Sequence, residues 1–162
     1  YILGDEGSAY KIAIAGMKAA LKSYDGREIS TRLIADFQNY FGLNNIEESI
    51  EIIYRKRLTV KEIAALAPIV DNAAFLGDKV ANQIIDNAVD ELVKVTVTVI
   101  DEIFIKGEFL EIVTTGSVWK SKCNMWQRFV NCINRDFINV KVIFPRFEPA
   151  YGAALLALKS LR

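Results

Sequence analysis

The residues best suited to chemistry stand together late in the chain, in the stretch Glu111–Ser121. An apolar, β-branched run there ends in Thr-Thr-Gly-Ser, and a Trp and a Lys follow before a helical pattern begins. This order predicts a strand, a tight turn and a helix. Backbone N–H groups at Gly116 and Ser117, with the positive end of the following helix, are suited to hold a phosphate or the polar edge of a nucleotide. The alternative is a turn that only reverses the chain.

Composition excludes several other kinds of site. The chain has no histidine, so it holds neither a Ser-His-Asp triad nor a His-ligated metal of its own. Basic and acidic residues balance at 20 each, and no basic run is longer than Arg55–Arg57, so nucleic acid is not an expected partner. Val93–Ile105 is too short and too polar to span a bilayer. Cys123 and Cys132 lack metal-type spacing and favour a reducing cytoplasm.

The elements that must position the Gly-Ser turn are mostly helices. Apolar spacing and capping residues predict helices that begin near Ser8, Ser30, Asn45, Thr59, Pro68 and Asp78. Thr59–Glu62 has the pattern of a capping box. In the helix after Asn45, the residues expected to face inward are Ile46, Ile50, Ile53 and Tyr54.

The longest predicted helix runs from Lys79 to about Ile105 and is expected to be central to the core. Its predicted inner face is Val80, Ile84, Ala88, Leu92, Val95, Val99 and Ile103. Within it, Val95–Val99 alternates like a strand, so a strand is the alternative there.

After Gly107 the pattern changes to strand, helix, strand, helix. The helices are predicted over Lys122–Arg135 and Tyr151–Leu161, and the second strand over Val140–Phe144. Such an order predicts a right-handed crossover between two parallel strands. Because two strands do not form a stable sheet, further strands are expected from sequence outside this chain. The expected fold class is α/β, rich in helix, with a small parallel sheet.

Two motifs stand out near the two ends of the chain, Gly4–Tyr10, which contains an acidic bend, and Gly116–Ser121. Taken together they resemble the N-acetylglucosamine kinases of the BadF/BcrA-type branch of actin-like ATPases. The Ala-rich helix Ile63–Ala74, the following Leu76–Asp78 and the tail Pro149–Leu155 are similar to the same family. The resemblance covers essentially the whole chain.

This resemblance implies a two-lobed enzyme with a ribonuclease H-like fold, of which residues 1–162 would be a single unit in the second lobe. Residues 1–107 would form its helical part and 108–162 its strand-helix part. The first lobe, with its phosphate loop and its catalytic aspartate, is expected in an N-terminal part that this chain lacks. No catalytic residue is therefore expected here, and a homodimer is one expected assembly.

The resemblance also implies ligand contacts. Asp5 would bind the hydroxyl groups of an amino sugar, while Glu6 would be solvated or structural. ATP would be the phosphoryl donor, and Mg²⁺ would be held by phosphates and water, with a carboxylate from the missing lobe. The nucleotide contacts would be Ala64, Gly116, Ser117 and Lys120, with Trp119 beside them. The hypothesis of a sugar kinase requires the acidic bend and the Gly-Ser turn to line one crevice.

Each of these readings has an alternative. Asp5 could cap a turn, Ala64 could be an ordinary small residue in helix packing, and Trp119 could belong to the core. At the level of function, one alternative is a non-sugar ATPase that activates a partner enzyme through an iron–sulfur cluster. The spacing of Cys123 and Cys132 does not resemble that motif. The other alternative is a helical interaction module without a ligand.

Overall fold

The computed structural model describes residues 4–105 and 107–160 of the chain. It has a helix-rich α/β fold with a small parallel sheet, as the sequence predicts. In chain order the elements are α1 (Ala9–Tyr24), α2 (Leu33–Phe41), α3 (Glu48–Arg55), α4 (Val60–Ala64), α5 (Ala67–Phe75), α6 (Lys79–Ile103), β1 (Leu110–Val113), the short 3₁₀ helix η1 (Ser117–Lys120), α7 (Met125–Asp136), β2 (Val140–Ile143) and α8 (Pro149–Ser160).

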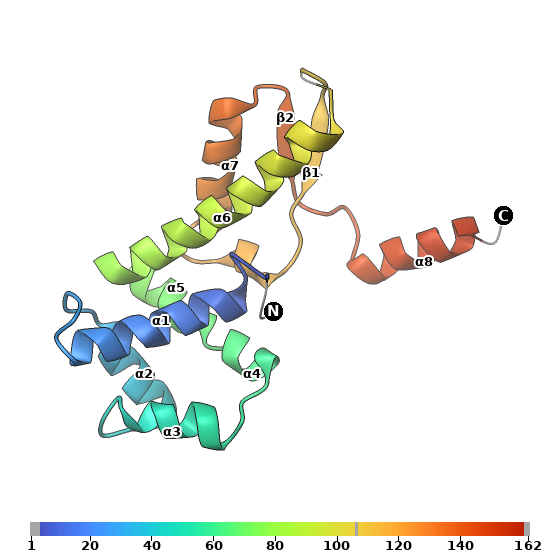
Figure 1. The fold of residues 1–162 in the computed structure, drawn as a ribbon. Helices are drawn as coiled ribbons and strands as arrows, with labels where there is room; N and C mark the ends of the chain where they lie inside the picture. The colour runs from blue at the N-terminus through green and yellow to red at the C-terminus, as the bar shows by residue number, and fades with distance from the viewer. Residues whose placement is uncertain (1–3, 106, 161–162) are drawn as a thin grey trace.

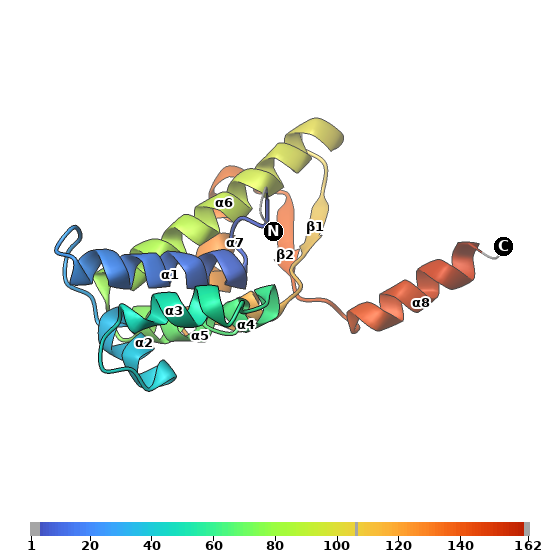
Figure 2. The same ribbon diagram turned by 60° about the horizontal axis from the view of Figure 1, so that its bottom comes forward.

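The front half of the molecule packs around α1, which contacts α2, α4, α5 and α6 (Figures 1 and 2). Ala13 and Ala20 on this helix have no exposed surface. A Cβ atom added at Gly16 would overlap Cγ2 of Val70 on α5, so the two helices approach too closely there for any side chain. Small residues on α1 thus allow the tight packing of the helical core.

Three of the predicted helix caps are confirmed, at Ser8, Asp78 and the Thr59–Glu62 capping box. The cap predicted at Ser30 is wrong, because α2 begins at Leu33. Instead, the buried Thr31 hydroxyl accepts the Leu33 N–H at 3.2 Å and donates to the Asp78 carboxylate at 2.9 Å. A contact with a residue 47 positions away therefore sets where α2 begins.

The long helix α6 forms as predicted and includes the alternating segment Val95–Val99. Its expected central position is correct mainly for the N-terminal half, where Ala81, Ile85, Ala88 and Val89 are buried, whereas Ile100 is the one buried residue described in the C-terminal half. In the C-terminal half Val99 is 44% exposed and Ile103 is 70% exposed. Figures 1 and 2 show why: this half runs out of the helical cluster toward β1.

The inner face predicted for α3 is correct in part. Ile46 is fully buried just before the helix, and Ile53 packs against the core. Ile50 and Tyr54 are 46% and 77% exposed, so their predicted inward positions are wrong.

The back half begins with the parallel pair β1 and β2, in which Leu110 is paired with Val140 and Val113 with Ile143. Helix α7 packs against both β2 and α6. It begins at Met125, three residues later than the predicted Lys122. The intervening N–H groups of Lys122 and Cys123 bond to Asp71 on α5 rather than starting the helix.

Helix α8 extends away from the other elements in both views (Figures 1 and 2). None of its described residues is buried, although several are apolar. Its stability therefore gains nothing from a core within this chain.

Candidate functional site

The acidic bend is fixed between α1 and α6. Asp5 adopts a left-handed conformation (φ 75°), and its carbonyl accepts the Ser8 N–H at 3.2 Å. Gly7 is buried, and a Cβ atom there would overlap the Leu92 side chain and lie 2.8 Å from the Ala88 carbonyl oxygen. Because the bend is packed this closely on α6, the exposed Asp5 carboxylate has a defined place at the start of α1.

The Gly-Ser turn follows the carboxyl end of β1 and is held by two tryptophans. The indole N–H of Trp119 donates to the Thr115 carbonyl at 3.1 Å, and that of Trp126 donates to the Thr114 hydroxyl at 3.1 Å. Trp126 in turn stacks on Phe144 with the ring centroids 4.7 Å apart. These contacts fix the backbone that leads into Gly116.

The helix expected directly after the turn is not an α-helix. The short 3₁₀ helix η1 follows Gly116, and α7 begins only at Met125. The prediction that the positive end of the following α-helix adds to the N–H groups of Gly116 and Ser117 is therefore wrong, because only η1 directly follows the turn. Any anion bound near this turn would instead be attracted by the side chains of Lys61, Lys120 and Lys122.

The acidic bend and the Gly-Ser turn line the same cavity, which we name the bend cavity. Its volume is about 470 Å³. Asp5 and the rest of the bend form one side, Thr114–Trp119 form another, and Leu92 and Thr96 of α6 contribute to the wall. The crevice expected from the sequence is therefore present, and it has room for a small polar ligand.

A second cavity of about 530 Å³ adjoins the first, and we name it the alanine cavity. One wall comes from α4 and α5, and the opposite wall comes from η1 and the residues after it. Ala9, Ser117 and Val118 line both cavities. The lining is mainly apolar, with the charged residues Lys61, Asp71, Lys120 and Lys122.

The structure sorts the predicted site residues between these two cavities. Asp5 and Gly116 line the bend cavity, Ala64 and Lys120 line the alanine cavity, and Ser117 lines both. Trp119 lines the bend cavity, next to Asp5 rather than Ala64. Predicted residues from three separate segments of the chain thus converge on one region around η1.

Sequence reasoning missed three charged residues of the alanine cavity, Lys61, Asp71 and Lys122. Lys61 could have been found, because it lies one helical turn before Ala64 and shares its face. Asp71 gives no such signal, since its partners are 51 and 52 residues away in the sequence.

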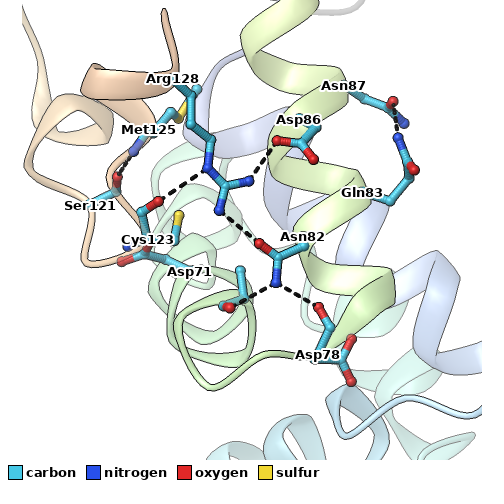
Figure 3. Close-up of polar contacts among 11 residues, drawn as sticks. Asp71, Asp78, Asn82, Gln83, Asp86, Asn87, Ser121, Cys123, Met125 and Arg128 are labelled. Atoms are coloured by element: carbon cyan, nitrogen blue, oxygen red, sulfur yellow. Dashed lines mark hydrogen bonds and ion pairs between the residues drawn. The ribbon is translucent and has the colours of Figure 1, made fainter. Parts of the chain in front are cut away.

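The loop behind the alanine cavity is fixed by side chains from α5, α6 and α7 (Figure 3). Arg128 donates to the Cys123 carbonyl at 3.2 Å, to Asn82 at 2.7 Å and to Asp86 at 2.6 Å. Burial, together with a hydrogen bond to Asp71, raises the pKa of the Cys123 thiol to about 11. This thiol therefore stays protonated at neutral pH and has a structural role rather than a nucleophilic one.

Within residues 4–105 and 107–160, no group of three or more His, Cys, Asp or Glu side chains is arranged to hold a metal ion. In the same residues, no helix combines the length and the apolarity that crossing a membrane requires.

Adjoining cavities at the carboxyl end of a parallel strand are typical of ligand-binding α/β proteins. Within that class the family can be named, because residues 1–157 match the model of the BadF/BadG/BcrA/BcrD ATPase family. The chain belongs to this family.

Two curated relatives are similar over nearly the whole chain. The N-acetylmuramic acid/N-acetylglucosamine kinase of Clostridium acetobutylicum is 34% identical over 157 residues, which are 97% of this chain and 51% of that protein. The N-acetyl-D-glucosamine kinase of Dictyostelium discoideum is 29% identical over 161 residues, which are 98% of this chain and 50% of that protein. The chain thus spans about half the length of these relatives.

Proposed function

We propose that this chain is part of an ATP-dependent kinase of N-acetylglucosamine or a related amino sugar, in which it forms walls for both the sugar and the nucleotide. Both relatives are named as kinases of such sugars. The observation that carries the proposal is the junction of the two cavities at Ser117 and Val118. Phosphoryl transfer requires the acceptor hydroxyl and the terminal phosphate to meet in line, and two adjoining cavities would bring the two ligands next to each other.

The bend cavity would hold the sugar. The Asp5 carboxylate is exposed there and can accept hydrogen bonds from two neighbouring hydroxyl groups. Such bonds are charge-assisted and are stronger than bonds between neutral groups. Asp5 would therefore orient the sugar, and Trp119 would contribute to another wall of the same cavity.

The alanine cavity would hold ATP, which supplies the phosphoryl group. The small side chains of Ala64, Ala65 and Ala67 leave space for a flat purine. Lys61, Lys120 and Lys122 on the rim supply positive charge that suits phosphates. Ser117 at the shared edge, with Gly116 directly before it in the bend cavity, would let the nucleotide approach the backbone closely.

Mg²⁺ would be bound mainly through phosphate oxygens and water, as is common for this ion at ATP sites. Asp71 is the carboxylate of the alanine cavity, and both its oxygens already accept backbone N–H groups. We therefore place the protein ligand of Mg²⁺, and the catalytic base, in the remaining half of the kinase.

The chain would act as one unit, the C-terminal part of the second lobe of an actin-like ATPase. Among the described residues β1 pairs with β2 alone, so the free edge of β1 is available for a strand from the other part of the protein. The remaining half would supply the first lobe. The assembly would work in the reducing cytoplasm, either alone or as a homodimer.

The test uses the full-length protein that contains this chain. We expect ADP to form only when an amino sugar is supplied. Asp5→Asn should raise KM for the sugar roughly tenfold to a hundredfold, because a hydrogen bond to a charged group contributes about 1.5–3 kcal/mol. Asp90→Asn is the control and should change little, because Asp90 is an exposed carboxylate on α6 that lines neither cavity. ADP formation that is independent of sugar would refute the proposal.

A further inference from the structure

We propose that Asp71 is a positioning residue that sets the width of the alanine cavity for its nucleotide. This inference rests on the proposed function, because it assigns that cavity to ATP. Asp71 lies on α5, on the wall that also carries Pro68, and its partners lie on the opposite wall.

The Asp71 carboxylate joins the two walls directly. One oxygen accepts the Lys122 N–H at 2.8 Å, and the other accepts the Cys123 N–H at 3.0 Å. Both bonds are charge-assisted and satisfy N–H groups that precede α7 and have no helical partner. A bidentate contact of this kind fixes orientation as well as distance.

The loop Lys120–Asn124 needs such a contact because its conformation is not one that a free chain prefers. Asn124 is left-handed (φ 59°), and its side chain does not cap α7. The Ser121 hydroxyl accepts the Met125 N–H at 2.8 Å, and Arg128 holds the Cys123 carbonyl from the other side (Figure 3). Asp71 is thus the link between this loop and the α5 wall.

The hydrogen bonds of Asp71 should affect the binding of ATP but not the binding of the sugar. Lys120 and Lys122 border the Asp71 contact, so movement of the loop would displace two of the cations that suit the phosphates. The bend cavity does not include Asp71 among the described residues that line it. Its Gly-Ser turn is held separately by the indole N–H groups of Trp119 and Trp126.

Asp78 offers a matched control for a purely structural effect. Its carboxylate also joins distant elements, accepting the Arg32 N–H at 2.8 Å and the Ala81 N–H at 2.8 Å. It does not appear in the lining of either cavity within the described residues. Asp78→Asn should therefore lower stability as Asp71→Asn does, without altering the nucleotide site.

The experiment measures Kd for ATP by calorimetry, and KM for ATP and for the amino sugar, in full-length wild type, Asp71→Asn and Asp78→Asn. We expect Asp71→Asn to raise Kd and KM for ATP roughly tenfold, equivalent to about 1.4 kcal/mol. KM for the sugar should stay unchanged, and Asp78→Asn should leave both constants near wild type. Asp71→Glu keeps the charge but moves it by one methylene, so its Kd and KM for ATP should lie between those of wild type and Asp71→Asn. If Asp71→Asn does not fold, Asp71→Glu is compared with Asp78→Asn instead.

An equal change in ATP affinity in the Asp71 and Asp78 variants, or none in either, would overturn the inference. A wild type that binds ATP but forms no ADP with any amino sugar would refute the proposed function alone. In that case the Kd comparison still decides the role of Asp71. A wild type that does not bind ATP would overturn both.

Discussion

Gly116 has a backbone conformation (φ 108°, ψ 167°) that is almost restricted to glycine. Apart from Gly116 itself and its two neighbours in the chain, no described residue has an atom within 4 Å of the position that a Cβ atom would take. Replacement by alanine would therefore add conformational strain without a steric clash. A glycine can be required for its backbone conformation or for the space that a side chain would fill. At Gly116 the first reason applies and the second does not.

We predict that Gly116→Ala lowers the free energy of unfolding by about 1–3 kcal/mol, the usual cost of a non-glycine residue in this region. The strained turn should also raise KM for both substrates in the full-length enzyme, because Gly116 leads into the residues that both cavities share. Chemical denaturation and steady-state kinetics measure the two effects. Gly152→Ala is the control, since Gly152 lies in α8 with open space around it. Equal stability of the two variants would contradict the prediction.

Among single residues, the family resemblance predicted Asp5, Ala64 and Gly116 as parts of the site. The structure brings these residues to adjoining cavities. The sequence did not predict Asp71 or Arg128. Their importance comes from partners on other helices, and a carboxylate that bonds an N–H group 51 positions away leaves no local pattern. Long-range hydrogen bonds of this kind are visible only in the folded chain.

Among the elements, α4 shows how a local motif fixes a wall of the alanine cavity. The Thr59 hydroxyl accepts the Glu62 N–H at 3.2 Å, and the Glu62 carboxylate accepts the Thr59 N–H at 2.7 Å. The hydroxyl and the N–H of Thr59 lower the pKa of Glu62. The half of the capping box that Glu62 supplies is therefore strongest while its carboxyl group is ionised, whereas the Thr59 hydroxyl accepts the Glu62 N–H in either state.

We predict a pH dependence from this shift. Because the pKa of Glu62 is lower in the folded than in the unfolded chain, its stabilising contribution is present above the unfolded value of about 4.3 and is lost as the pH falls through the folded value. At pH 7 Glu62→Gln should be less stable than wild type, and the difference should shrink toward pH 3. Denaturation curves at both pH values measure it. A difference that is constant with pH would show that the charge of Glu62 is not involved.

The first residues of the helices show which helix boundaries can be predicted from the local sequence. Ser8, Thr59 and Asp78 cap their helices as predicted, because each cap accepts an N–H group three positions along. The starts of α2 and α7 were misplaced because Asp78 and Asp71, from other elements, bind the N–H groups just before them. Element boundaries were thus predictable where the cap is local and not where it is tertiary.

For the whole molecule, the helical half has its own core, whereas the strand-helix half is incomplete. Val140 and Val142 are buried under α7, but Val113 on β1 is 53% exposed and Phe109 before it is 66% exposed. An apolar two-stranded sheet with a free edge needs further strands or a covering layer. This incompleteness agrees with the coverage of about half of each relative.

The same reasoning predicts that α8 contributes nothing to the stability of this chain by itself. Leu155, Leu156 and Leu158 are 44%, 70% and 62% exposed, so its removal uncovers no core. A chain that ends at Glu148 should have a free energy of unfolding within about 0.5 kcal/mol of residues 1–162, as for surface changes in general. In the full-length protein the same deletion should be destabilising, because the leucines would then cover apolar surface on the remaining half. Thermal and chemical denaturation measure the effect of the deletion, both in residues 1–162 and in the full-length protein. A deletion that destabilises residues 1–162 but not the full-length protein would contradict the prediction.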